Sequence, residues 1–363
     1  MIKRGLALMG AYGGINAGDE MILRALVQRG RADGYGGEIL VIGNRKPSGS
    51  SQVVDYSGRG LSAQKQRQIL TAMRRVRRRD IVIGGGQIID GVAGVQLPLI
   101  QLACAVAAKS GGGLVSIVGV STARLEQTLV RRVYRTLFGL CDRIEARDPK
   151  SADDILEIAP AVANKLTSRA DLVFGMRDTI TPSEERDRDM VLFAPHHSPK
   201  LALTSIKEMI ALLKALRTAT PEKKIGLAIH DPRHGFDGGL VQRLEDANAL
   251  EGIAIHEPRT TDETIALYRR AASIVSVRMH PIIIGSCAGA RCVPIGASRK
   301  QRLLAEELSL QSYDIADLLA MDPGTLRKVL GMNGESCGLP SGTALTQLAS
   351  AAQGPLFTDP APR

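Results

Sequence analysis

Short runs of apolar residues alternate with longer amphipathic stretches along most of the 363 residues. The short runs are rich in Ile, Val and Leu, as strands buried on both faces are, and the longer stretches have the apolar spacing of helices. This alternation predicts α/β architecture with parallel sheets covered by helices on both faces. The expected strands lie at 5–9, 38–42, 81–84, 114–120, 143–146 and 171–174, and then at 190–194, 225–229, 253–257, 273–277 and 292–296.

The strands fall into two series that are separated by a polar segment, residues 177–189 (RDTITPSEERDRD). We interpret this segment as a linker. The pattern therefore predicts two Rossmann-like domains, residues 1–176 and 190–353, facing each other across a cleft. Residues 354–363 are expected to form a loosely ordered tail.

Composition narrows the classes of function. The chain has no Trp and only 3% aromatic residues, which disfavours stacked Trp platforms for sugars and the stacking surfaces of RNA-binding sheets. Its 47 Lys and Arg against 37 Asp and Glu give a net charge of +10. Such a charge favours anionic partners, which include phosphorylated metabolites, nucleic acid and anionic membranes. No nucleic-acid-binding module is recognisable, so nucleic acid is not an expected partner.

The five cysteines are scattered and form no CxxC pair, which disfavours a structural zinc site or a disulfide framework. The N-terminal apolar run at residues 6–9 is too short for a secretion signal, and the longest apolar stretch, 95–108, is too short to span a membrane. These features together predict a cytoplasmic protein.

Ligands of parallel sheets bind beyond the carboxyl ends of the strands, so the loops there are the candidate site. The loop at residues 10–20 (GAYGGINAGDE) can bring glycine backbone close to a ligand, and Asn16 or Asp19 can cap the next helix. A plain turn and cap is an equally good interpretation. The three glycines at 84–86 can offer N–H groups to an anion or a sugar, or can allow a strand and a helix to pack closely.

The most informative loop follows the strand at 273–277. Arg278 and His280 come directly after it, and Pro281 is expected at the first position of an apolar helix, which places His280 at or near the N-cap. Free N–H groups at such a helix end favour an anion. An Arg that binds a phosphate or carboxylate and a His that moves a proton fit this arrangement. A structural, helix-capping role for His280 is the alternative.

Further histidines follow two strands of the second series. His196, His197 and Lys200 come after the strand at 190–194, and His230 comes after the strand at 225–229. Their spacing matches no zinc signature, so no metal is expected. A run of five arginines between residues 74 and 79 ends a helical stretch. It is best interpreted as a solvated basic face, next as a dock for anionic lipid headgroups, and last as a contact for nucleic acid.

In this order the loops resemble the polysaccharide pyruvyl transferase family of bacterial exopolysaccharide and cell-wall enzymes. The resemblance covers about residues 5–305, with motifs at Gly10, Tyr12, Gly13, Asn16, Gly18, Asp19 and Glu20, at Gly84, Gly85 and Gly86, at Arg147, Asp148, Ser151 and Asp171, and at Arg278, His280, Gly289 and Lys300. It implies a GT-B-like fold. It also implies transfer of the pyruvyl group of phosphoenolpyruvate onto two hydroxyls of a sugar, as a ketal, with release of phosphate and without a cofactor.

The resemblance assigns roles to residues. Arg278 and His280 take the catalytic positions, and the expected substrate-binding residues are Tyr12, Gly13, Asn16, Asp19, Glu20, Gly85, Gly86, His196, His197 and Lys300. The first domain is expected to hold the saccharide acceptor and the second the donor. A lipid-linked acceptor would bring the enzyme to the inner face of an anionic cell membrane as a peripheral protein.

The chain departs from the family pattern in two places. Ala297, Ser298 and Arg299 precede Lys300 where an aromatic residue and Asp-Pro are common, and His196-His197 stand where Arg is usual. These departures leave open the alternative that the protein is a GT-B glycosyltransferase with a nucleotide-sugar donor. Such an enzyme usually carries an acidic ribose-binding residue late in the second domain, where Glu306 and Glu307 are the nearest candidates.

Overall fold

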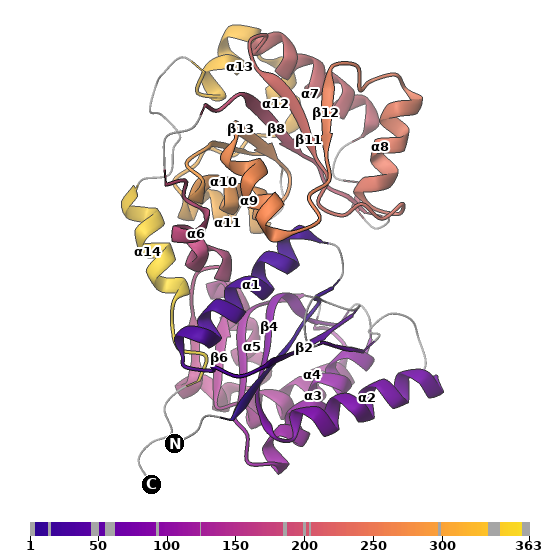
Figure 1. Cartoon of the computed structure of the whole chain (residues 1–363), viewed down its shortest axis with the longest axis vertical. Coiled ribbons are helices and arrows are strands. Elements are labelled where there is room, and N and C mark those ends of the chain that lie inside the picture. Colours follow the sequence, from indigo (N-terminus) through magenta and orange to yellow (C-terminus); the bar gives the residue numbers. More distant parts are fainter. Residues whose placement is uncertain are drawn as a thin grey trace. The chain divides into compact units, whose positions relative to one another are not determined.

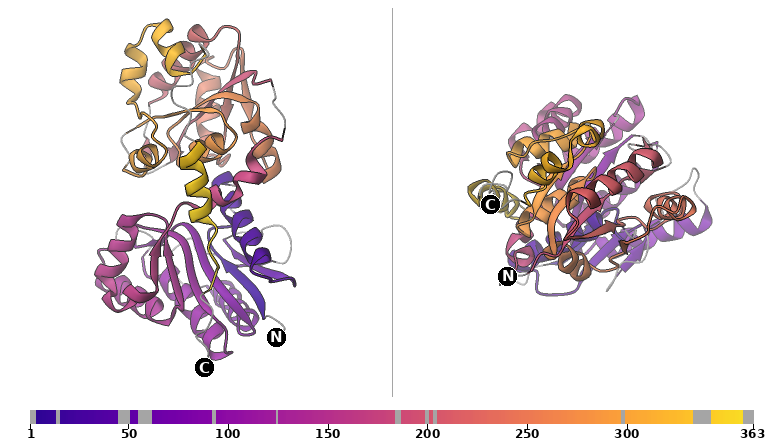
Figure 2. Two further views of the ribbon diagram at one scale, coloured as in Figure 1. Left: turned by 90° about the vertical axis from the view of Figure 1, so that its left-hand side faces the viewer. Right: turned by 90° about the horizontal axis from the view of Figure 1, so that it is seen from above.

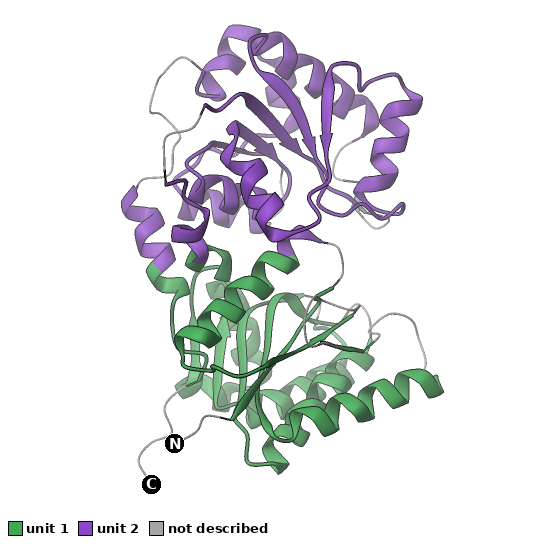
Figure 3. Ribbon diagram, viewed as in Figure 1, with its two compact units in different colours: residues 1–14, 19–175, 350–363 green, residues 15–18, 176–349 purple. Residues whose placement is uncertain are grey.

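The computed structural model describes residues 4–13, 16–44, 51–54, 62–91, 94–123, 125–183, 187–198, 201–202, 205–296, 299–332 and 342–357. The chain forms two compact units, coloured separately in Figure 3. Unit 1 comprises residues 1–14, 19–175 and 350–363, and unit 2 comprises residues 15–18 and 176–349. Each unit is an α/β domain built on a parallel sheet, as the alternation of strands and helices predicted.

Unit 1 contains a seven-stranded parallel sheet with the strand order β3-β2-β1-β4-β5-β6-β7 (Figure 1). Its strands are β1 (Gly5–Met9), β2 (Ile39–Gly43), β3 (Ser51–Val53), β4 (Arg79–Asp90), β5 (Val115–Ala123), β6 (Arg143–Ala146) and β7 (Leu166–Ser168). The helices are α1 (Ala17–Ala32), α2 (Ala63–Val76), α3 (Gln96–Ser110), α4 (Thr128–Leu140) and α5 (Pro149–Ile158), with 3-10 turns η1 (Pro160–Lys165) and η2 (Leu172–Met176).

The helices of unit 1 cover both faces of this sheet. Alternate residues of the strands, such as Ile81 and Ile83 of β4, share a core with the buried sides of α2, α3, α4 and α5. Leu6 of β1 points to the opposite face, where it lies against Gly30 of α1. Strands that are buried on both faces have to be apolar throughout, which is why they appear in the sequence as unbroken runs.

Unit 2 contains a five-stranded parallel sheet with the order β12-β11-β8-β13-β14 and a two-stranded antiparallel ribbon (Figures 1 and 2). Its strands are β8 (Met190–Ala194), β9 (His197–Ser198), β10 (Leu201–Ala202), β11 (Lys224–Ala228), β12 (Ile253–His256), β13 (Ala271–Ser276) and β14 (Arg291–Pro294). The helices are α6 (Arg177–Ile180), α7 (Ile206–Ala219), α8 (Asp237–Asp246), α9 (Thr261–Arg269), α10 (Met279–Cys287), α11 (Arg299–Glu307), α12 (Ile315–Ala320), α13 (Pro323–Val329) and α14 (Gly342–Ala352).

Each sheet has one point at which the strand order reverses. In unit 1 this point lies between β1 and β4, and in unit 2 it lies between β8 and β13. Loops that leave neighbouring strands in opposite directions open a crevice there, at the carboxyl ends of the strands. The loop at 10–13 follows β1, and the glycines at 84–86 lie within β4. The loop at 195–197 follows β8, and the loop at 277–278 follows β13. All four candidate loops therefore lie at a reversal point.

One expected strand is wrong. Residues 172–174 instead lie in the 3-10 turn η2, and Asp171 directly precedes it. The carboxylate of Asp171 accepts a hydrogen bond from the Val173 amide (3.0 Å), which favours a turn over a strand ladder. The edge strand is instead β7, which is three residues long and too exposed to form an apolar run.

The boundaries also differ from the expected ones. The expected linker carries helix α6, and Arg188 donates hydrogen bonds to the carbonyls of Ala271 (3.0 Å) and Ala288 (2.6 Å) of unit 2. The first described residues of the expected loose tail are packed into unit 1. Leu356 is fully buried, and its amide donates to Asp33 (2.6 Å). No helix in the described part of the chain is both long and apolar enough to cross a membrane.

Candidate functional site

Arg278 lies directly beyond the carboxyl end of β13, and its side chain is fixed at two points. Its Nε donates to the carbonyl of Pro195, which follows the neighbouring strand β8 (2.8 Å). Its Nη2 donates to both carboxylate oxygens of Asp237, at 2.8 and 2.7 Å. The guanidinium therefore lies at the strand-order reversal of unit 2, held by the loop after β8 and by the first residue of α8.

Asp237, the first residue of α8, is the residue on which this arrangement depends. Its carboxylate is fully buried, and besides Arg278 it accepts hydrogen bonds from the amides of His197 (2.9 Å) and Asp231 (3.1 Å). A buried carboxylate is stable only when it is paired and hydrogen-bonded in this way. Asp237 thus ties the loops after β8, β11 and β13 to one another.

Helix α10 begins two positions earlier than expected. Arg278 occupies the N-cap position and makes no side-chain cap, Met279 is the first helical residue, and His280 is the second. Pro281 falls at the third position rather than the first. The first turn tolerates this because its N–H groups have no partner within the helix. His280 is therefore inside the helix, and its side chain is not an N-cap.

His280 is packed against the segment that begins α1. A Cβ atom on Gly18 would lie 2.2 Å from His280 Nδ1, so only glycine leaves room for the imidazole in this position. The side chain of Asn16 accepts a hydrogen bond from the Gly18 amide (3.0 Å), and the Ala17 amide donates to the carbonyl of His230 (3.1 Å). Asn16 is thus the helix cap that the sequence suggested, and it lies in unit 2 with His280 and His230.

Two histidines near Arg278 are held in the neutral form. Burial, together with the charge of Arg278, lowers the pKa of His196 to about 4. Burial, followed by the charges of Arg278 and His280, lowers the pKa of His230 well below its usual value. The Nε2 atom of His230 lies 2.5 Å from the hydroxyl of Tyr268, and Nδ1 of His196 is buried with no hydrogen-bond partner in the described structure. His197 contributes its amide, through Asp237, to the same cluster.

The backbone around Arg278 is also held from α11. The amide group of Gln301 donates to the carbonyls of Ser276 (3.0 Å) and Arg278 (3.1 Å). Lys300, the preceding residue, lies in the first turn of this helix and is half-buried. Lys200, Ala297 and Ser298 lie outside the described residues.

The candidate residues of unit 1 form a second cluster at its own reversal point. Tyr12 is buried and donates its hydroxyl proton to the carbonyl of Gly84 (2.6 Å), which joins the loop after β1 to β4. The amide of Gly13, a residue with a φ of 73°, donates to the Glu20 carboxylate (2.7 Å). These two contacts stabilise the loop, and they show Tyr12 and Glu20 in contact with the protein's own backbone.

The glycine run is not a strand end, contrary to expectation, because β4 continues through it to Asp90 with a register shift. Gly85 and Gly86 have φ angles of 78° and 74°, which glycine adopts without strain. A Cβ on Gly85 would lie 2.0 Å from the side chain of Ile22 in α1, and a Cβ on Gly86 would lie 3.5 Å from Asp19. The sequence allowed two interpretations of these glycines, an anion or sugar contact and close packing of a strand on a helix. The second is present at Gly85.

The motif at residues 145–151 has a structural explanation. Asp148 is the N-cap of α5 and accepts hydrogen bonds from the amide (2.8 Å) and hydroxyl (3.0 Å) of Ser151. Arg147 forms a buried ion pair with Asp171 (3.3 Å). Glu145 is fully buried among Arg29, Arg143 and Arg169. These contacts hold together the carboxyl end of β6 and the start of η2.

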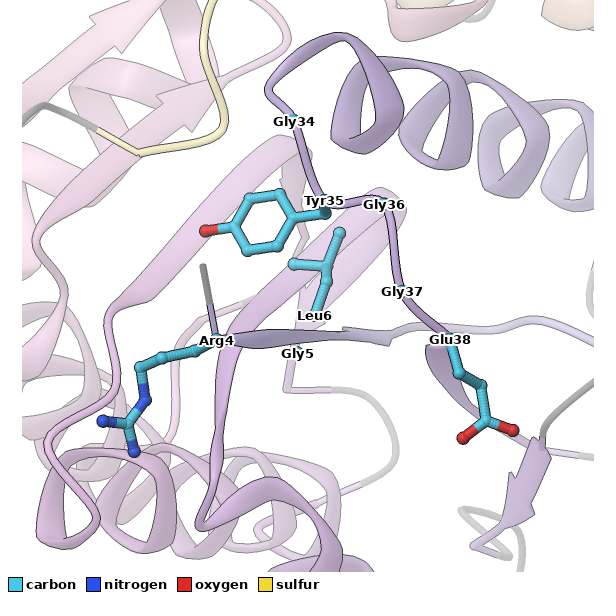
Figure 4. A pocket seen from close by; sticks show the side chains of 8 residues that line it. All are labelled: Arg4, Gly5, Leu6, Gly34, Tyr35, Gly36, Gly37 and Glu38. Atoms are coloured by element: carbon cyan, nitrogen blue, oxygen red, sulfur yellow. The ribbon is translucent and has the colours of Figure 1, made fainter. Parts of the chain in front are cut away.

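Other features of the described residues lie apart from this chemistry. Figure 4 shows a pocket of about 350 Å³ in unit 1, where Arg4 and Glu38 project from opposite ends. It lies at the amino ends of β1 and β2, on the edge of the sheet opposite the candidate loops. Within the described ranges, no three His, Cys, Asp or Glu side chains are grouped as ligands of a metal ion would be.

The fold is shared with solved structures of low sequence identity. UDP-GlcNAc 2-epimerase from Methanocaldococcus jannaschii is 13% identical, with a TM-score of 0.63 over 96% of this chain and 97% of that chain. A putative UDP-N-acetylglucosamine 2-epimerase from Listeria monocytogenes is 10% identical, with a TM-score of 0.59 over 98% and 93%. HepE from Anabaena, in complex with UDP and glucose, is 12% identical, with a TM-score of 0.53 over 96% and 94%.

These likenesses establish the fold, two Rossmann-like domains of the GT-B type, and confirm the architecture expected from the sequence. No curated protein matches the sequence. The family model for polysaccharide pyruvyl transferase matches residues 16–299, a span that begins at Asn16 and ends beyond the Arg278–His280 loop. The chain therefore belongs to the polysaccharide pyruvyl transferase family.

Proposed function

We propose that this protein transfers the pyruvyl group of phosphoenolpyruvate onto two hydroxyls of a sugar, as a ketal, with release of phosphate. The acceptor is a sugar of a polysaccharide or of its lipid-linked precursor, and the enzyme works in the cytoplasm. The reaction requires no cofactor. Family membership supports the transferase class, and the fixed pair of Arg278 and His280 at the reversal point of unit 2 is the observation that carries the proposal.

The donor's chemistry explains the need for both residues. The methylene carbon of phosphoenolpyruvate gains a proton, one sugar oxygen bonds to the central carbon, and the bond from that carbon to the phosphate oxygen breaks. The second sugar oxygen then bonds to the same carbon. Of the two protons that the hydroxyls lose, one balances the new methyl group and the other leaves with phosphate or solvent.

Arg278 is assigned to the anionic end of the donor. An Arg fork matches phosphate and carboxylate geometry, and a charge that grows on the departing phosphate is best stabilised by a group that is already in place. Asp237 and Pro195 supply that placement by occupying Nη2 and Nε. Arg278 Nη1 has no hydrogen bond within the described residues, so this edge of the guanidinium is the one assigned to the donor.

His280 is assigned the proton transfer. An imidazole can donate a proton to the methylene carbon and accept one from a hydroxyl. Gly18 and the first turn of α10 fix the position of its ring. His196 and His230 are the reserve candidates, and their lowered pKa values suit a proton acceptor better than a proton donor.

The remaining candidates are assigned to substrate binding and to positioning of the loops. Gly13, Asp19 and Gly86 of unit 1 are proposed to bind the acceptor, and Asn16, His197 and Lys300 of unit 2 to surround the donor. Tyr12, Glu20 and Gly85 act through the backbone contacts described above, as positioning residues for the loop after β1.

A glycosyltransferase with a nucleotide-sugar donor is the competing candidate, favoured by the fold that this chain shares with proteins solved with UDP and UDP-sugars. Thermal unfolding with phosphoenolpyruvate, UDP-sugars and an oligonucleotide separates the two. Phosphoenolpyruvate at a hundredfold excess over its dissociation constant is expected to stabilise the protein by about 2.7 kcal/mol. Stabilisation by a UDP-sugar without stabilisation by phosphoenolpyruvate would instead support the glycosyltransferase.

A further inference from the structure

The layer formed by α2, α3 and α4 carries charge of one sign. These helices lie side by side on one face of the unit 1 sheet (Figure 1). Together the three fully described helices contain eight Lys and Arg and no Asp or Glu. The whole chain has 37 Asp and Glu among 363 residues, about one in ten. The absence of acidic residues from the 42 positions of these three helices therefore distinguishes this face from the rest of the chain.

The basic charge is concentrated where α2 and α3 end. A depression of about 680 Å³ there is lined by Arg74, Arg75, Arg77, Arg78, Arg79, Ser110 and Gly111. Arg74, Arg77 and Arg78 are exposed, and no ion pair of theirs is found within the described part of the chain. By contrast, Arg79 donates to the Arg75 carbonyl (2.7 Å) and lies 3.8 Å from Glu38.

Complementing the helix dipole accounts for only part of this cluster. Cations near a helix C-terminus interact favourably with its carbonyls, and Arg79 makes such a contact. Arg77 and Arg78 follow the helix and carry exposed side chains whose mutual repulsion is not offset by a neighbouring carboxylate. A cluster of this kind is stable in isolation only through solvation, and it is well suited to bind several anionic groups at once.

Apolar side chains are exposed on the same layer. Leu70 of α2 is 52% exposed, and Val106 of α3 is 47% exposed. Leu70 precedes Arg74 by one helical turn, and Val106 precedes Ser110 by one turn, so both lie next to the arginine-lined depression. Leu99 of α3 and Leu129 of α4, also exposed, lie on the same layer. Exposure of these large apolar side chains to water is unfavourable. Next to arginines, they are suited to burial at the boundary between lipid headgroups and acyl chains.

We propose that the outer face of α2, α3 and α4 docks the protein on a membrane that contains anionic lipid. The arginines at 74–79 bind headgroup phosphates, and Leu70 and Val106 enter the interface between them. The apolar component favours a lipid surface over a nucleic acid, which would be bound by the charge alone. This surface is the outer helical layer of unit 1, with its arginines where α2 and α3 end, and the inference stands independently of the donor proposed above.

Sedimentation with lipid vesicles tests the proposal. The full chain is mixed with vesicles of phosphatidylcholine alone or with about one third phosphatidylglycerol. Binding is expected only to the anionic vesicles, and it is expected to weaken with salt. Joint substitution Arg74→Gln, Arg77→Gln and Arg78→Gln is expected to weaken it by roughly a hundredfold, since each basic residue near the surface contributes about a factor of five. Leu70→Gln with Val106→Gln is expected to weaken it severalfold.

Matched substitutions in unit 2 serve as controls. Lys207→Gln, Lys214→Gln and Arg243→Gln remove the same charge from exposed positions, and Ile255→Gln removes an exposed apolar side chain. They are expected to leave vesicle binding within about twofold. Equal binding to neutral vesicles, or an equal loss in the control triple variant, would overturn the proposal. A second result would also overturn it: the Leu70→Gln, Val106→Gln variant binds vesicles like the wild type, and a single-stranded oligonucleotide fully displaces the protein from the vesicles. The surface would then be a nucleic-acid site. Unchanged thermal unfolding of every variant verifies folding.

Discussion

A single buried carboxylate determines where the arginine of the candidate site can reach. Asp237 fixes Nη2 of Arg278 and gathers the loops after β8 and β11 at the same time. A lysine at position 278 could keep the charge but could not contact Pro195 and Asp237 together while offering a third edge to a ligand. The contacts in unit 2 therefore fix the orientation of the guanidinium as well as the position of its charge.

Substitutions of this pair should affect donor binding and turnover together. Arg278→Lys and Asp237→Asn are each expected to lower kcat/KM for phosphoenolpyruvate by roughly ten- to hundredfold, because each removes a charged hydrogen bond. Asp246→Asn, at an exposed position on the same helix, is the control and should leave the kinetics unchanged. Steady-state assays of phosphate release with acceptor present give the result. Wild-type kinetics for Asp237→Asn would show that Arg278 does not depend on it.

His280 should behave as a proton carrier and not as a helix cap. His280→Ala is expected to leave the dissociation constant of phosphoenolpyruvate nearly unchanged and to lower turnover by roughly a hundred- to ten-thousandfold. Because His280 is the second residue of α10, His280→Asn restores no cap and should be equally slow. An active His280→Asn enzyme would transfer the role to His196, His197 or His230.

The free energy of unfolding should decrease as the pH falls below neutrality, at pH values above those at which carboxylates titrate. The pKa of His196 is lowered from 6.5 to about 4, and that of His230 is lowered as well, so the unfolded chain takes up protons below pH 6.5 that the folded chain does not. Unfolding free energy is therefore expected to fall as pH decreases from 7 to 5. His196→Gln should flatten this dependence, and His234→Gln, at an exposed position, should not. Chemical denaturation at several pH values provides the measurement, and identical slopes in all three proteins would contradict the assignment.

The sequence drew attention to Arg278, His280 and Asn16 as candidates because a polar residue directly after a buried strand, or directly before a helix, is a local signal. It did not identify Asp237, Gln301 or Tyr268, whose importance comes from contacts across the sheet. Asp237 stands 41 positions before Arg278, among other polar residues after β11. Spacing along the chain contains no information about such a pair.

At the scale of elements, apolar runs located most strands but failed where strands are short or exposed. The bounds of β8 were predicted to the residue, whereas β3, β7, β9 and β10, two or three residues each, have no recognisable pattern. The error at 171–174 has the same origin. Leu172, Val173 and Phe174 are buried as a strand would be, and only the turn formed by Asp171 decides against it.

The C-terminal segment is an element in its own right and should stabilise unit 1. Leu356 is fully buried, and the carbonyls of Gly354 and Pro355 accept hydrogen bonds from Arg29. Leu356→Ala is therefore expected to cost about 2–5 kcal/mol. Leu70→Ala, at a half-exposed position, should change stability by no more than about 0.5 kcal/mol. Urea unfolding of both variants tests this, and equal midpoints would mean that the segment adds nothing.

At the scale of the whole molecule, the strand–helix alternation was sufficient to predict two α/β domains with parallel sheets. Apolar residues follow one another in buried parallel strands, whereas they recur with a helical period in the covering helices. The alternation was not sufficient to assign the ends of the units. Residues 15–18 belong to unit 2, and residues 350–363 return to unit 1. The unit to which each of these segments belongs depends on contacts with residues hundreds of positions away. The polarity of the segment itself does not predict such contacts.

The central claim, pyruvyl transfer from phosphoenolpyruvate, is tested most directly by the mass of the product. Purified enzyme is incubated with phosphoenolpyruvate and a set of saccharide and lipid-linked saccharide acceptors, and phosphate is measured in parallel. The account predicts an acceptor that gains about 70 mass units, the two-proton loss included, with one phosphate released per transfer. Both products are expected to form at least about tenfold more slowly with the Arg278→Lys variant and about a hundredfold more slowly with the His280→Ala variant. Transfer of a hexose from a UDP-sugar, with no reaction of phosphoenolpyruvate, would contradict it.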